Sequence, residues 1–466
     1  MFQKSSFKFS HNVAFVSDLG EKMLYKDIQE FSDRIKKVIN KRSLVFCLCD
    51  NTAGSLCGYV SFIDNGVVPL LLNASIDIEL LDNLVQLYEP NYVWLKDTLS
   101  ESYPDYETMF SEHGYSLVQI SKKVVALDDQ LALLLTTSGS TGSPKLVRLS
   151  YTNIQANAES IAEYLNITEN DRPITALPMS YTFGLSVINS HMIRGATLLL
   201  TDKSIAQKEF WIFFRTQKAT SMAGVPFSYE MLKRLRFFSM DLPSLKTLTQ
   251  AGGKLSPELV QEFVEDANKK GRQFIVMYGQ TEATARMSYL PFEKAKEKFK
   301  SVGIAIPGGD FTLINEQGHI IESFDTDGEL IYSGKNVSMG YAECREDLAK
   351  SDENGGVLHT GDIARRDTDG FYYITGRLKR FIKIYGNRVN LDESEQIVKS
   401  ITPACACVGR DDKMIVYVTN KSLCSQVKEL LSEKTGLNSR AFEIRYIAEI
   451  PKNSSGKVQY IELNNE

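Results

Sequence analysis

The sequence predicts an α/β fold, followed by a β-rich segment and a small C-terminal unit of mixed strands and helices. Through the first two-thirds of the chain, short apolar runs such as SLVFCLC, VVPLLL, YVWL, LALLLTT and FIVMY alternate with amphipathic stretches. Such runs are typical of parallel strands that helices cover on both faces. From about Ser301 onward, turn signals at 315–318, 325–328 and 367–370 separate shorter segments, which indicates hairpins.

Length and composition are those of an ordinary globular protein with more than one packed unit. The chain has 466 residues, of which 43% are hydrophobic and 24% charged. Its net charge of -5 argues against a nucleic-acid-binding surface, which would normally be basic. The start MFQKSSFKFSHNVAF has no apolar signal region, and no apolar run approaches the about 20 residues that span a bilayer. We therefore expect a cytoplasmic protein without a membrane span.

The cysteines favour burial over metal binding. There are 7 of them, an odd number that fits a reducing compartment. Cys47 and Cys49 lie two residues apart, as do Cys405 and Cys407, so each pair would share one face of a strand. Only 5 histidines could complete a metal site. We expect buried small side chains and no structural metal.

The strongest local motif is TSGSTGSPK at 137–145. A buried strand at 131–137 precedes it, and an amphipathic helix follows, which we expect Thr152 to cap together with Gln155. An isolated Ser/Gly stretch would more often be a flexible turn, but the strand before it and the Pro-Lys pair after it favour phosphate binding. Glycines let backbone N–H groups turn inward, and the hydroxyls and the lysine add donors. The residues expected to contact phosphate are Thr137, Ser138, Gly139, Ser140, Thr141, Gly142 and Lys145.

With four later motifs in the same order, this loop resembles the adenylate-forming superfamily, which includes acyl-CoA synthetases, peptide-synthetase adenylation domains and beetle luciferase. The later motifs are YGQTE at 278–282, HTGD at 359–362, GRLKRFIK at 376–383 with GNRV at 386–389, and PKNSSGK at 451–457. The resemblance implies an AMP-forming ligase that uses ATP and Mg²⁺ to activate a carboxylic acid as an acyl-adenylate. Transfer to a thiol, either coenzyme A or the phosphopantetheine of a carrier protein, would follow.

The resemblance also implies a domain arrangement. Residues 1–376 would form a large N-terminal domain of stacked α/β sheets, with a small β-rich subdomain at about 301–376. Residues 379–466 would form a small mobile α+β lid. The lid would swing between a form that makes the adenylate and a form that consumes it. The residues assigned to the hinge and to the second half-reaction are Lys379, Lys383 and Gly386, although a turn between strands explains Gly386 equally well.

The superfamily motifs assign roles in the first half-reaction. Glu282 would hold Mg²⁺ and Thr281 would bind the α-phosphate. Asp362 would accept the ribose hydroxyls near Arg377, and Lys457 would neutralise charge that develops during adenylation. The predicted catalytic residues are Lys457, Thr281, Glu282 and Lys145. The other predicted nucleotide contacts are Ala251, Gly252 and Gly253 on one side of the adenine and Tyr278 and Gly279 on the other.

The acyl pocket is expected to be modest and mainly apolar. Many acyl-CoA-forming relatives have histidine where Tyr181 stands, and many amino-acid-activating relatives have aspartate near Thr182. Because a buried ammonium without a partner is costly, an ordinary α-amino acid is disfavoured. The same aromatic side chains could instead be core residues. The predicted pocket residues are Tyr181, Thr182, Phe183, Gly184, Val225 and Phe227.

Several alternatives stay open at this point. The acceptor could be an amine in place of a thiol, which would make the enzyme an amide ligase. A protein of another class, a catalytically inactive nucleotide-binding module, is a further alternative. No Asp-Ser-Leu attachment site for phosphopantetheine occurs in the chain, so an acyl or peptidyl carrier protein would be a separate partner. The sequence does not name the acid, the pathway or the oligomeric state.

Overall fold

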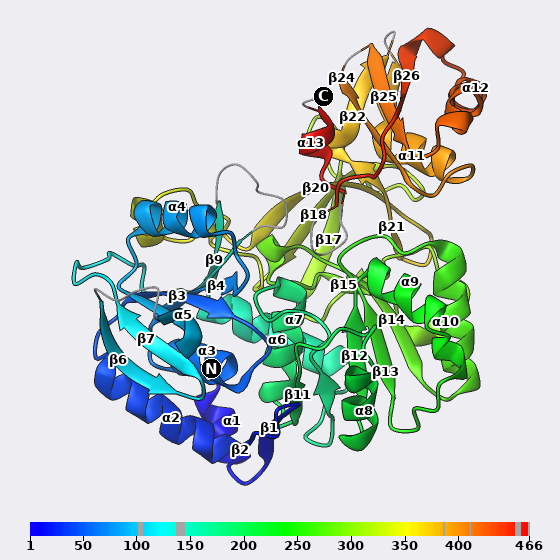
Figure 1. Ribbon diagram of the computed structural model, residues 1–466. Helices are drawn as coiled ribbons and strands as arrows, with labels where there is room; N and C mark the ends of the chain where they lie inside the picture. Colours follow the sequence, from blue (N-terminus) through cyan, green and yellow to red (C-terminus); the bar gives the residue numbers. More distant parts are fainter. Residues whose placement is uncertain (101–105, 137–144, 385–386, 411, 453–457, 465–466) are drawn as a thin grey trace. The chain divides into compact units, whose positions relative to one another are not determined.

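The computed structural model describes residues 1–100, 106–136, 145–384, 387–410, 412–452 and 458–464 (Figure 1). The chain divides into two compact units. The first comprises Met1–Phe299, Gly303–Asp310 and Tyr332–Leu358; the second comprises Lys300–Val302, Phe311–Ile331 and His359–Glu466. No helix in these described ranges is long and apolar enough to cross a membrane.

An eight-stranded sheet in the first unit is buried on both faces. Its strands, in spatial order, are β19 (Gly340–Ala342), β9 (Leu146–Ser150), β8 (Leu131–Thr136), β4 (Val68–Asn73), β3 (Leu44–Cys49), β5 (Tyr92–Lys96), β7 (Tyr115–Gln119) and β6 (Glu107–Glu112). Helices α2 (Tyr25–Val38) and α3 (Ala53–Asp64) cover one face and α4 (Ile78–Tyr88) covers the other. In β3, Cys47 and Cys49 face α3, whereas Phe46 and Leu48 face α4. The predicted burial of both faces is therefore confirmed.

A nine-stranded sheet forms the other half of the first unit. Its strands, in spatial order, are β16 (Ile304–Ala305), β15 (Ser288–Tyr289), β14 (Gln273–Tyr278), β13 (Thr247–Gln250), β12 (Ser221–Gly224), β10 (Pro173–Ile174), β11 (Leu198–Leu200), β1 (Val13–Ser17) and β2 (Lys22–Leu24). The run from β14 to β1 is parallel. The remaining helices of the unit are α1 (Gln3–Lys8), α5 (Asp97–Ser100), α6 (Tyr151–Tyr164), α7 (Thr182–Met192), α8 (Lys208–Thr216), α9 (Pro226–Arg234) and α10 (Pro257–Lys269).

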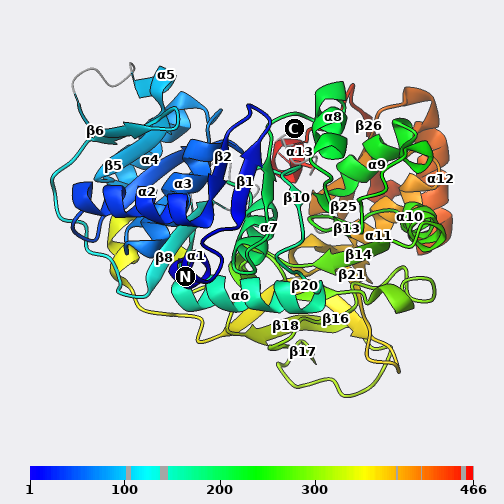
Figure 2. The ribbon, with the colours of Figure 1, turned by 90° about the horizontal axis from the view of Figure 1, so that it is seen from below.

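Helix α7 lies between the two sheets (Figure 2). Leu185 and Ile188 pack into the core that includes Cys47 of β3. Phe183 and Val187, on the other side of the helix, pack against residues of β12 and β14. A helix that is apolar on two faces can join two sheets into one unit, because each face buries surface against a different sheet.

The start of α6 differs from the prediction. Thr152 and Gln155 were expected to cap it, but Ser150 caps it: the Asn153 amide donates to Ser150 Oγ at 3.0 Å, and the Ser150 amide donates to Asn153 Oδ1 at 2.8 Å. Because β9 runs directly into the helix, the first free amides lie earlier than the hydrophobic pattern suggests. The Gln155 side chain instead donates to Glu159 on the same helix.

The second unit contains the hairpins that the turn signals predicted. Its four-stranded sheet has the order β17 (Gly309–Ile314), β18 (Gly328–Gly334), β20 (Val357–Arg366) and β21 (Tyr372–Arg377). The turn at 367–370 closes when the Gly370 amide donates to the Asp367 carbonyl. The chain then forms β22 (Phe381–Ile384), β23 (Asn387–Asn390), α11 (Leu391–Lys399), β24 (Cys405–Arg410), β25 (Lys413–Val418), α12 (Cys424–Thr435), β26 (Phe442–Tyr446) and α13 (Tyr460–Asn464).

The two compact units divide the predicted β-rich subdomain in another way than the sequence-based boundaries do. Those boundaries placed 301–376 in the N-terminal domain, whereas Phe311–Ile331 and His359–Glu466 pack together in the second unit. The hinge at Lys379 stays a prediction, because packing does not report motion.

A buried carboxylate holds the C-terminal part of the second unit together. Glu395 on α11 accepts hydrogen bonds from Arg380 (3.2 Å), Lys399 (2.9 Å), the Tyr460 hydroxyl (3.0 Å) and the Cys407 amide (3.1 Å). These donors come from four separate parts of the chain. The carboxylate therefore links β24, α11 and α13 to the segment before β22.

We predict that Glu395→Gln lowers the free energy of unfolding of this unit by about 3 kcal/mol, because it removes the buried anion that Arg380, Lys399 and the Cys407 amide share, although Arg380 keeps its second partner Asp392. Denaturant unfolding followed by amide exchange in α11 and β24 measures the change. Glu433→Gln is the matched control: Glu433 is 72% exposed beside Lys434, and its loss should change stability by less than about 0.5 kcal/mol. Equal effects of the two changes would contradict the prediction.

Candidate active site

Three neighbouring parallel strands end at the same edge of the nine-stranded sheet. β12 ends at Gly224, which lies opposite Gln250, the last residue of β13, and Gln250 lies opposite Val276 near the end of β14. Open α/β sheets bind ligands beyond the carboxyl ends of their strands. The predicted segments 225–227, 251–253 and 278–282 follow these three ends, so the structure brings them together.

The predicted adenine wall contacts the predicted acyl pocket. Gly252 has a φ of +82°, and a Cβ atom there would lie 2.5 Å from Tyr181 Oη and 3.1 Å from Val225 Cγ1. The Gln250 side chain donates to the Gly253 carbonyl at 2.9 Å, which braces the loop. Glycine at 252 is therefore required both for its conformation and for the close approach of Tyr181.

The segment after β14 folds back on itself tightly. A Cβ atom at Gly279 would lie 1.7 Å from the Ala285 carbonyl oxygen. The Ala285 amide donates to the Gln280 carbonyl, and Ala285 itself has a φ of +96°, in the left-handed region. This turn directs Thr281 and Glu282, in the short 3₁₀ helix Thr281–Ala283, to the carboxyl edge of the sheet.

Two hydroxyls meet at the first turn of α7. The Oγ1 atoms of Thr182 and Thr281 are 2.9 Å apart. Thr182 opens α7, whose N-cap residue provides no side-chain cap, so the first amides of the helix remain available for an anion. Sequence reasoning assigned Thr182 to the acyl pocket and Thr281 to phosphate. The two residues with these predicted roles are therefore in contact.

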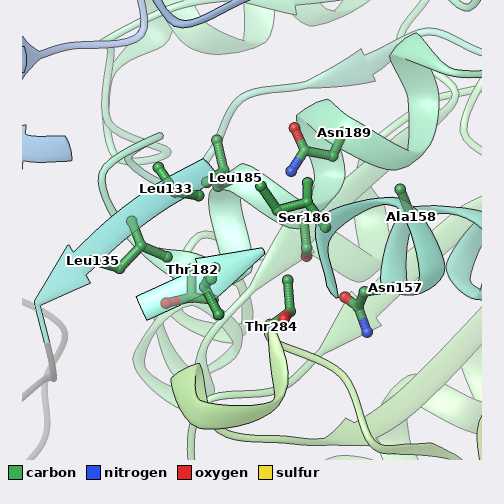
Figure 3. A pocket seen from close by; sticks show the side chains of 11 residues that line it. Leu133, Leu135, Asn157, Ala158, Thr182, Leu185, Ser186, Asn189 and Thr284 are labelled. Atoms are coloured by element: carbon green, nitrogen blue, oxygen red, sulfur yellow. The ribbon is translucent and has the colours of Figure 1, made fainter. Parts of the chain in front are cut away.

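The strand before the phosphate-loop motif ends close to this hydroxyl pair. Leu135 of β8 and Thr182 line one crevice of about 260 Å³ of empty space, together with Ser186 and Thr284 (Figure 3). Thr137, Ser138, Gly139, Ser140, Thr141 and Gly142 lie outside the described residues.

Lys145, the last residue of the loop motif, lies at the same site. Lys145 Nζ is 3.6 Å from the centre of the Tyr341 ring and 3.9 Å from the Glu343 carboxylate. The Tyr341 hydroxyl in turn donates to Glu282 Oε1 at 2.8 Å. Burial, and then the neighbouring Glu282, raise the pKa of Tyr341, so its hydroxyl keeps its proton and remains a donor. Leu135, before the loop, therefore lies near the Thr182–Thr281 pair, and Lys145, at its end, lies near Tyr341 and Glu282.

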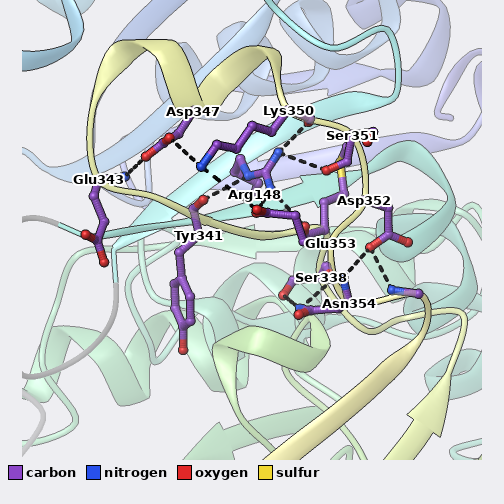
Figure 4. A network of polar contacts seen from close by, with 12 residues as sticks. Arg148, Ser338, Tyr341, Glu343, Asp347, Lys350, Ser351, Asp352, Glu353 and Asn354 are labelled. Atoms are coloured by element: carbon purple, nitrogen blue, oxygen red, sulfur yellow. Dashed lines mark hydrogen bonds and ion pairs between the residues drawn. The ribbon is translucent and has the colours of Figure 1, made fainter.

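The sequence-based prediction missed Tyr341. Arg148 of β9 fixes its backbone: this fully buried guanidinium donates to the carbonyls of Tyr341 (3.0 Å) and Met339 (2.9 Å) and pairs with Glu353 (Figure 4). No motif marks Tyr341. Only its pairing with β9 brings it beside Glu282, and that pairing is a tertiary feature.

The contacts of Glu282 suit the role of Mg²⁺ ligand that the sequence predicts for it. Mg²⁺ prefers carboxylate oxygens. The Glu282 carboxylate is held by the Tyr341 hydroxyl, and its backbone carbonyl accepts from the Ser338 amide at 2.8 Å. A bound Mg²⁺ would neutralise phosphate charge.

In the second unit, the two predicted ribose ligands form a pair. Asp362 of β20 lies opposite Arg377 of β21, and Arg377 Nε donates to Asp362 Oδ1 at 3.0 Å. The Asp362 side chain is 3% exposed and that of Arg377 is 63% exposed. Lys379 lies in a short 3₁₀ helix and Lys383 in β22; Gly386 and Lys457 lie outside the described residues.

The predicted apolar pocket needs a correction. Phe183 is buried as expected, but the guanidinium of Arg286 lies 4.3 Å from the centre of its ring. Phe227 is 52% exposed on α9. Gly184 is a packing residue, since a Cβ atom there would lie 2.2 Å from the Pro178 carbonyl oxygen. Sequence reasoning missed Arg286; the signal was a lone arginine in the apolar stretch ARMSYL.

The chain is similar to known CoA ligases over much or nearly all of its length. It is 25% identical to the 2-succinylbenzoate–CoA ligase of Lactococcus lactis over 460 residues, which cover 96% of both chains. It is 26% identical to the oxalate–CoA ligase of Arabidopsis thaliana, over 74% of this chain and 69% of the relative. The solved structure of O-succinylbenzoate coenzyme A synthetase from Bacillus subtilis with AMP has a TM-score of 0.81 at 20% identity, covering 100% of this chain and 98% of that chain.

These findings confirm the predicted α/β fold with a large N-terminal and a small C-terminal domain. They also confirm the predicted superfamily and the prediction of an AMP-forming carboxylate ligase that uses ATP, Mg²⁺ and CoA. Residues 2–342, well over half of the chain, match the family described as AMP-binding enzyme. The chain therefore belongs to the AMP-binding enzyme family.

Proposed function

We propose that this enzyme joins a carboxylic acid to AMP at the carboxyl edge of the nine-stranded sheet and then transfers the acyl group to the thiol of coenzyme A. The observation that carries the proposal is the 2.9 Å contact between Thr182 and Thr281 at the start of α7. It joins a residue predicted for the acyl pocket to a residue predicted to bind phosphate, which supports the proposal. That is the geometry needed where a carboxylate meets the α-phosphorus.

In the first half-reaction, a carboxylate oxygen attacks the α-phosphorus and the bond to pyrophosphate breaks. Two anions must approach each other, so donors have to surround the phosphates. The Thr281 hydroxyl, the first amides of α7 and Lys145 supply such donors. Glu282 would hold Mg²⁺. In the second half-reaction the sulfur attacks the acyl carbonyl and AMP leaves.

Residues of the second unit complete this scheme. The buried Asp362, oriented by Arg377, would accept both ribose hydroxyls, which suits a carboxylate with two acceptor oxygens. Lys457 would act during adenylation, and a swing at Lys379 would then present Lys383 and Gly386 to the thiol. The paired Asp362 and Arg377 support the ribose assignment; the swing is carried over from the superfamily.

Coenzyme A is the favoured acceptor because the relatives' names specify it. The same names specify different acids or acyl groups: oxalate, 2-succinylbenzoate, feruloyl and indoleacetate. The names therefore support the acceptor and leave the acid open. A carrier-protein thiol or an amine is the alternative acceptor.

We predict Mg²⁺-dependent exchange between ATP and pyrophosphate in the presence of an accepted acid, with AMP as product. Hydroxylamine trapping with and without CoA then tests the acceptor, because only a thiol user gives a CoA-dependent product. Release of ADP and phosphate would indicate an acyl-phosphate route and would contradict the proposal. If CoA does not change the product of hydroxylamine trapping, an amine would be the favoured acceptor.

We predict that Glu282→Gln weakens activity mainly through Mg²⁺ and that raising Mg²⁺ restores part of it. Tyr341→Phe should raise the Mg²⁺ concentration for half-maximal exchange about 10-fold, because it removes the donor that orients Glu282. Tyr151→Phe is the matched control, since the Tyr151 hydroxyl has no hydrogen-bond partner within the described residues. No response of Glu282→Gln to Mg²⁺ would count against the metal assignment.

We predict that Lys457→Ala slows adenylate formation by roughly 100- to 1,000-fold, as expected for loss of an oxyanion donor. Transfer from a supplied acyl-adenylate to CoA should change little, because an interaction present in one transition state affects only that step. Gly386→Leu should show the opposite pattern. Equal loss of both steps in Lys457→Ala would argue against a swinging lid.

A further inference from the structure

Arg286 carries a buried charge without an anionic partner. It is 1% exposed. One Nη atom donates to Ser186 Oγ at 3.0 Å, and the other contacts Tyr164 Oη at 3.3 Å and Met277 Sδ. Its Nε has no hydrogen-bond partner, and Arg286 forms no ion pair with any residue that the structure describes.

This arrangement is unusual because guanidinium groups keep their charge and buried charges are normally paired. Arg148 in the same unit is just as deeply buried, but it pairs with Glu353. Burial lowers the pKa of Arg286, which reflects the cost of keeping this cation out of water. The orphaned Nε and the adjacent Nη form the pair of donors that meets a carboxylate in a bidentate contact.

The position of Arg286 connects it to the adenylation site. Its partner Ser186 stands four residues after Thr182 on α7, one helical turn of about 5 Å further along. Its guanidinium packs on Phe183, whose neighbour in sequence is Thr182. Through Ser186 and Phe183, Arg286 therefore contacts the first turns of the helix that begins with Thr182 of the hydroxyl pair.

Arg286 also lines a cavity in the described part of the first unit. The cavity has about 1170 Å³ of empty space, is open to solvent and is lined by residues of α6, α7, β12, β13 and β14. Burial lowers the pKa of His191 in its wall to about 4, so this imidazole is neutral near pH 7. Asp171, also in the wall, pairs with Lys246 at 3.9 Å. Nothing in this wall neutralises Arg286.

We propose that Arg286 binds a second carboxylate of the substrate, and that the acids this enzyme activates are short dicarboxylic acids. The inference rests on the proposed adenylation. The reacting carboxylate would lie at Thr182 and Thr281, and the second would lie at Arg286, whose partner Ser186 is one helical turn, about 5 Å, along α7 from Thr182. An α-ammonium group would face this cation without a carboxylate partner, which agrees with the expectation that ordinary amino acids are poor substrates.

The test compares two acyl-sulfamoyl adenosines, non-reactive stand-ins for the acyl-adenylate. One carries a glutaryl group with its free carboxylate, and the other carries the matching primary amide, which has the same size and no charge. Isothermal titration calorimetry gives both Kd values for the wild type, Arg286→Met, Arg286→Lys and Arg272→Met. Arg272 is the matched control, a buried arginine of the first unit that donates to the Leu242 carbonyl.

The wild type should bind the carboxylate compound about 10- to 100-fold more tightly than the amide, as expected for a charge-assisted contact. Arg286→Met should abolish this preference, Arg286→Lys should retain part of it, and Arg272→Met should leave it unchanged. Equal affinities in the wild type, or a preference that survives Arg286→Met, would overturn the role of Arg286 while leaving adenylation intact. Failure of both compounds to bind would overturn the adenylation site itself. The wild-type comparison stands even if a variant does not fold.

Discussion

Helix α7 belongs to two hydrophobic cores at once, and the candidate site depends on this. One side of the helix packs against the eight-stranded sheet through Leu185 and Ile188. The other packs against the nine-stranded sheet through Phe183 and Val187. Because both sides are fixed by burial, the start of the helix cannot shift without exposing apolar surface in one core. Thr182 is thereby held against Thr281, so the residues proposed for phosphate binding and for the acyl pocket lie together.

The same constraint explains why the site is assembled at the ends of secondary structure elements. Most residues of β12, β13 and β14 are buried, and the segments beyond their carboxyl ends meet at one edge of the sheet. Gly252 and Gly279 let the chain turn sharply there, where a side chain would collide with Tyr181 or with the Ala285 carbonyl. The turns at Gly252 and Gly279 thus bring the segments of the site close together, and the glycines themselves add no side chain there.

Two buried arginines of the first unit show how differently the fold uses the same group. Arg148 donates hydrogen bonds to backbone carbonyls and pairs with Glu353, and these contacts fix β19, the strand that contains Tyr341. Among the residues that the structure describes, Arg286 contacts only neutral partners, and its Nε has no hydrogen-bond partner. The first completes a structural network, whereas the second leaves positive charge at a cavity wall. A buried cation of this kind selects among ligands more strongly than apolar packing does, because an unpaired charge costs more than an unfilled space.

The sequence by itself determined the layered α/β fold, the family and the order of the nucleotide-binding segments, because apolar runs and short motifs depend on neighbouring residues alone. It also identified Thr281 and Glu282, since both follow a recognisable strand. Only the tertiary structure decided that Tyr341 donates to Glu282, that Ser150 caps α6, and that the buried Arg286 packs on Phe183. These contacts join residues that are distant in sequence or depend on how one element runs into the next. The Tyr341 and Arg286 contacts have no local pattern, because each arises from which strands and helices the folded core brings together; the Ser150 cap is local, but where β9 ends decides its position.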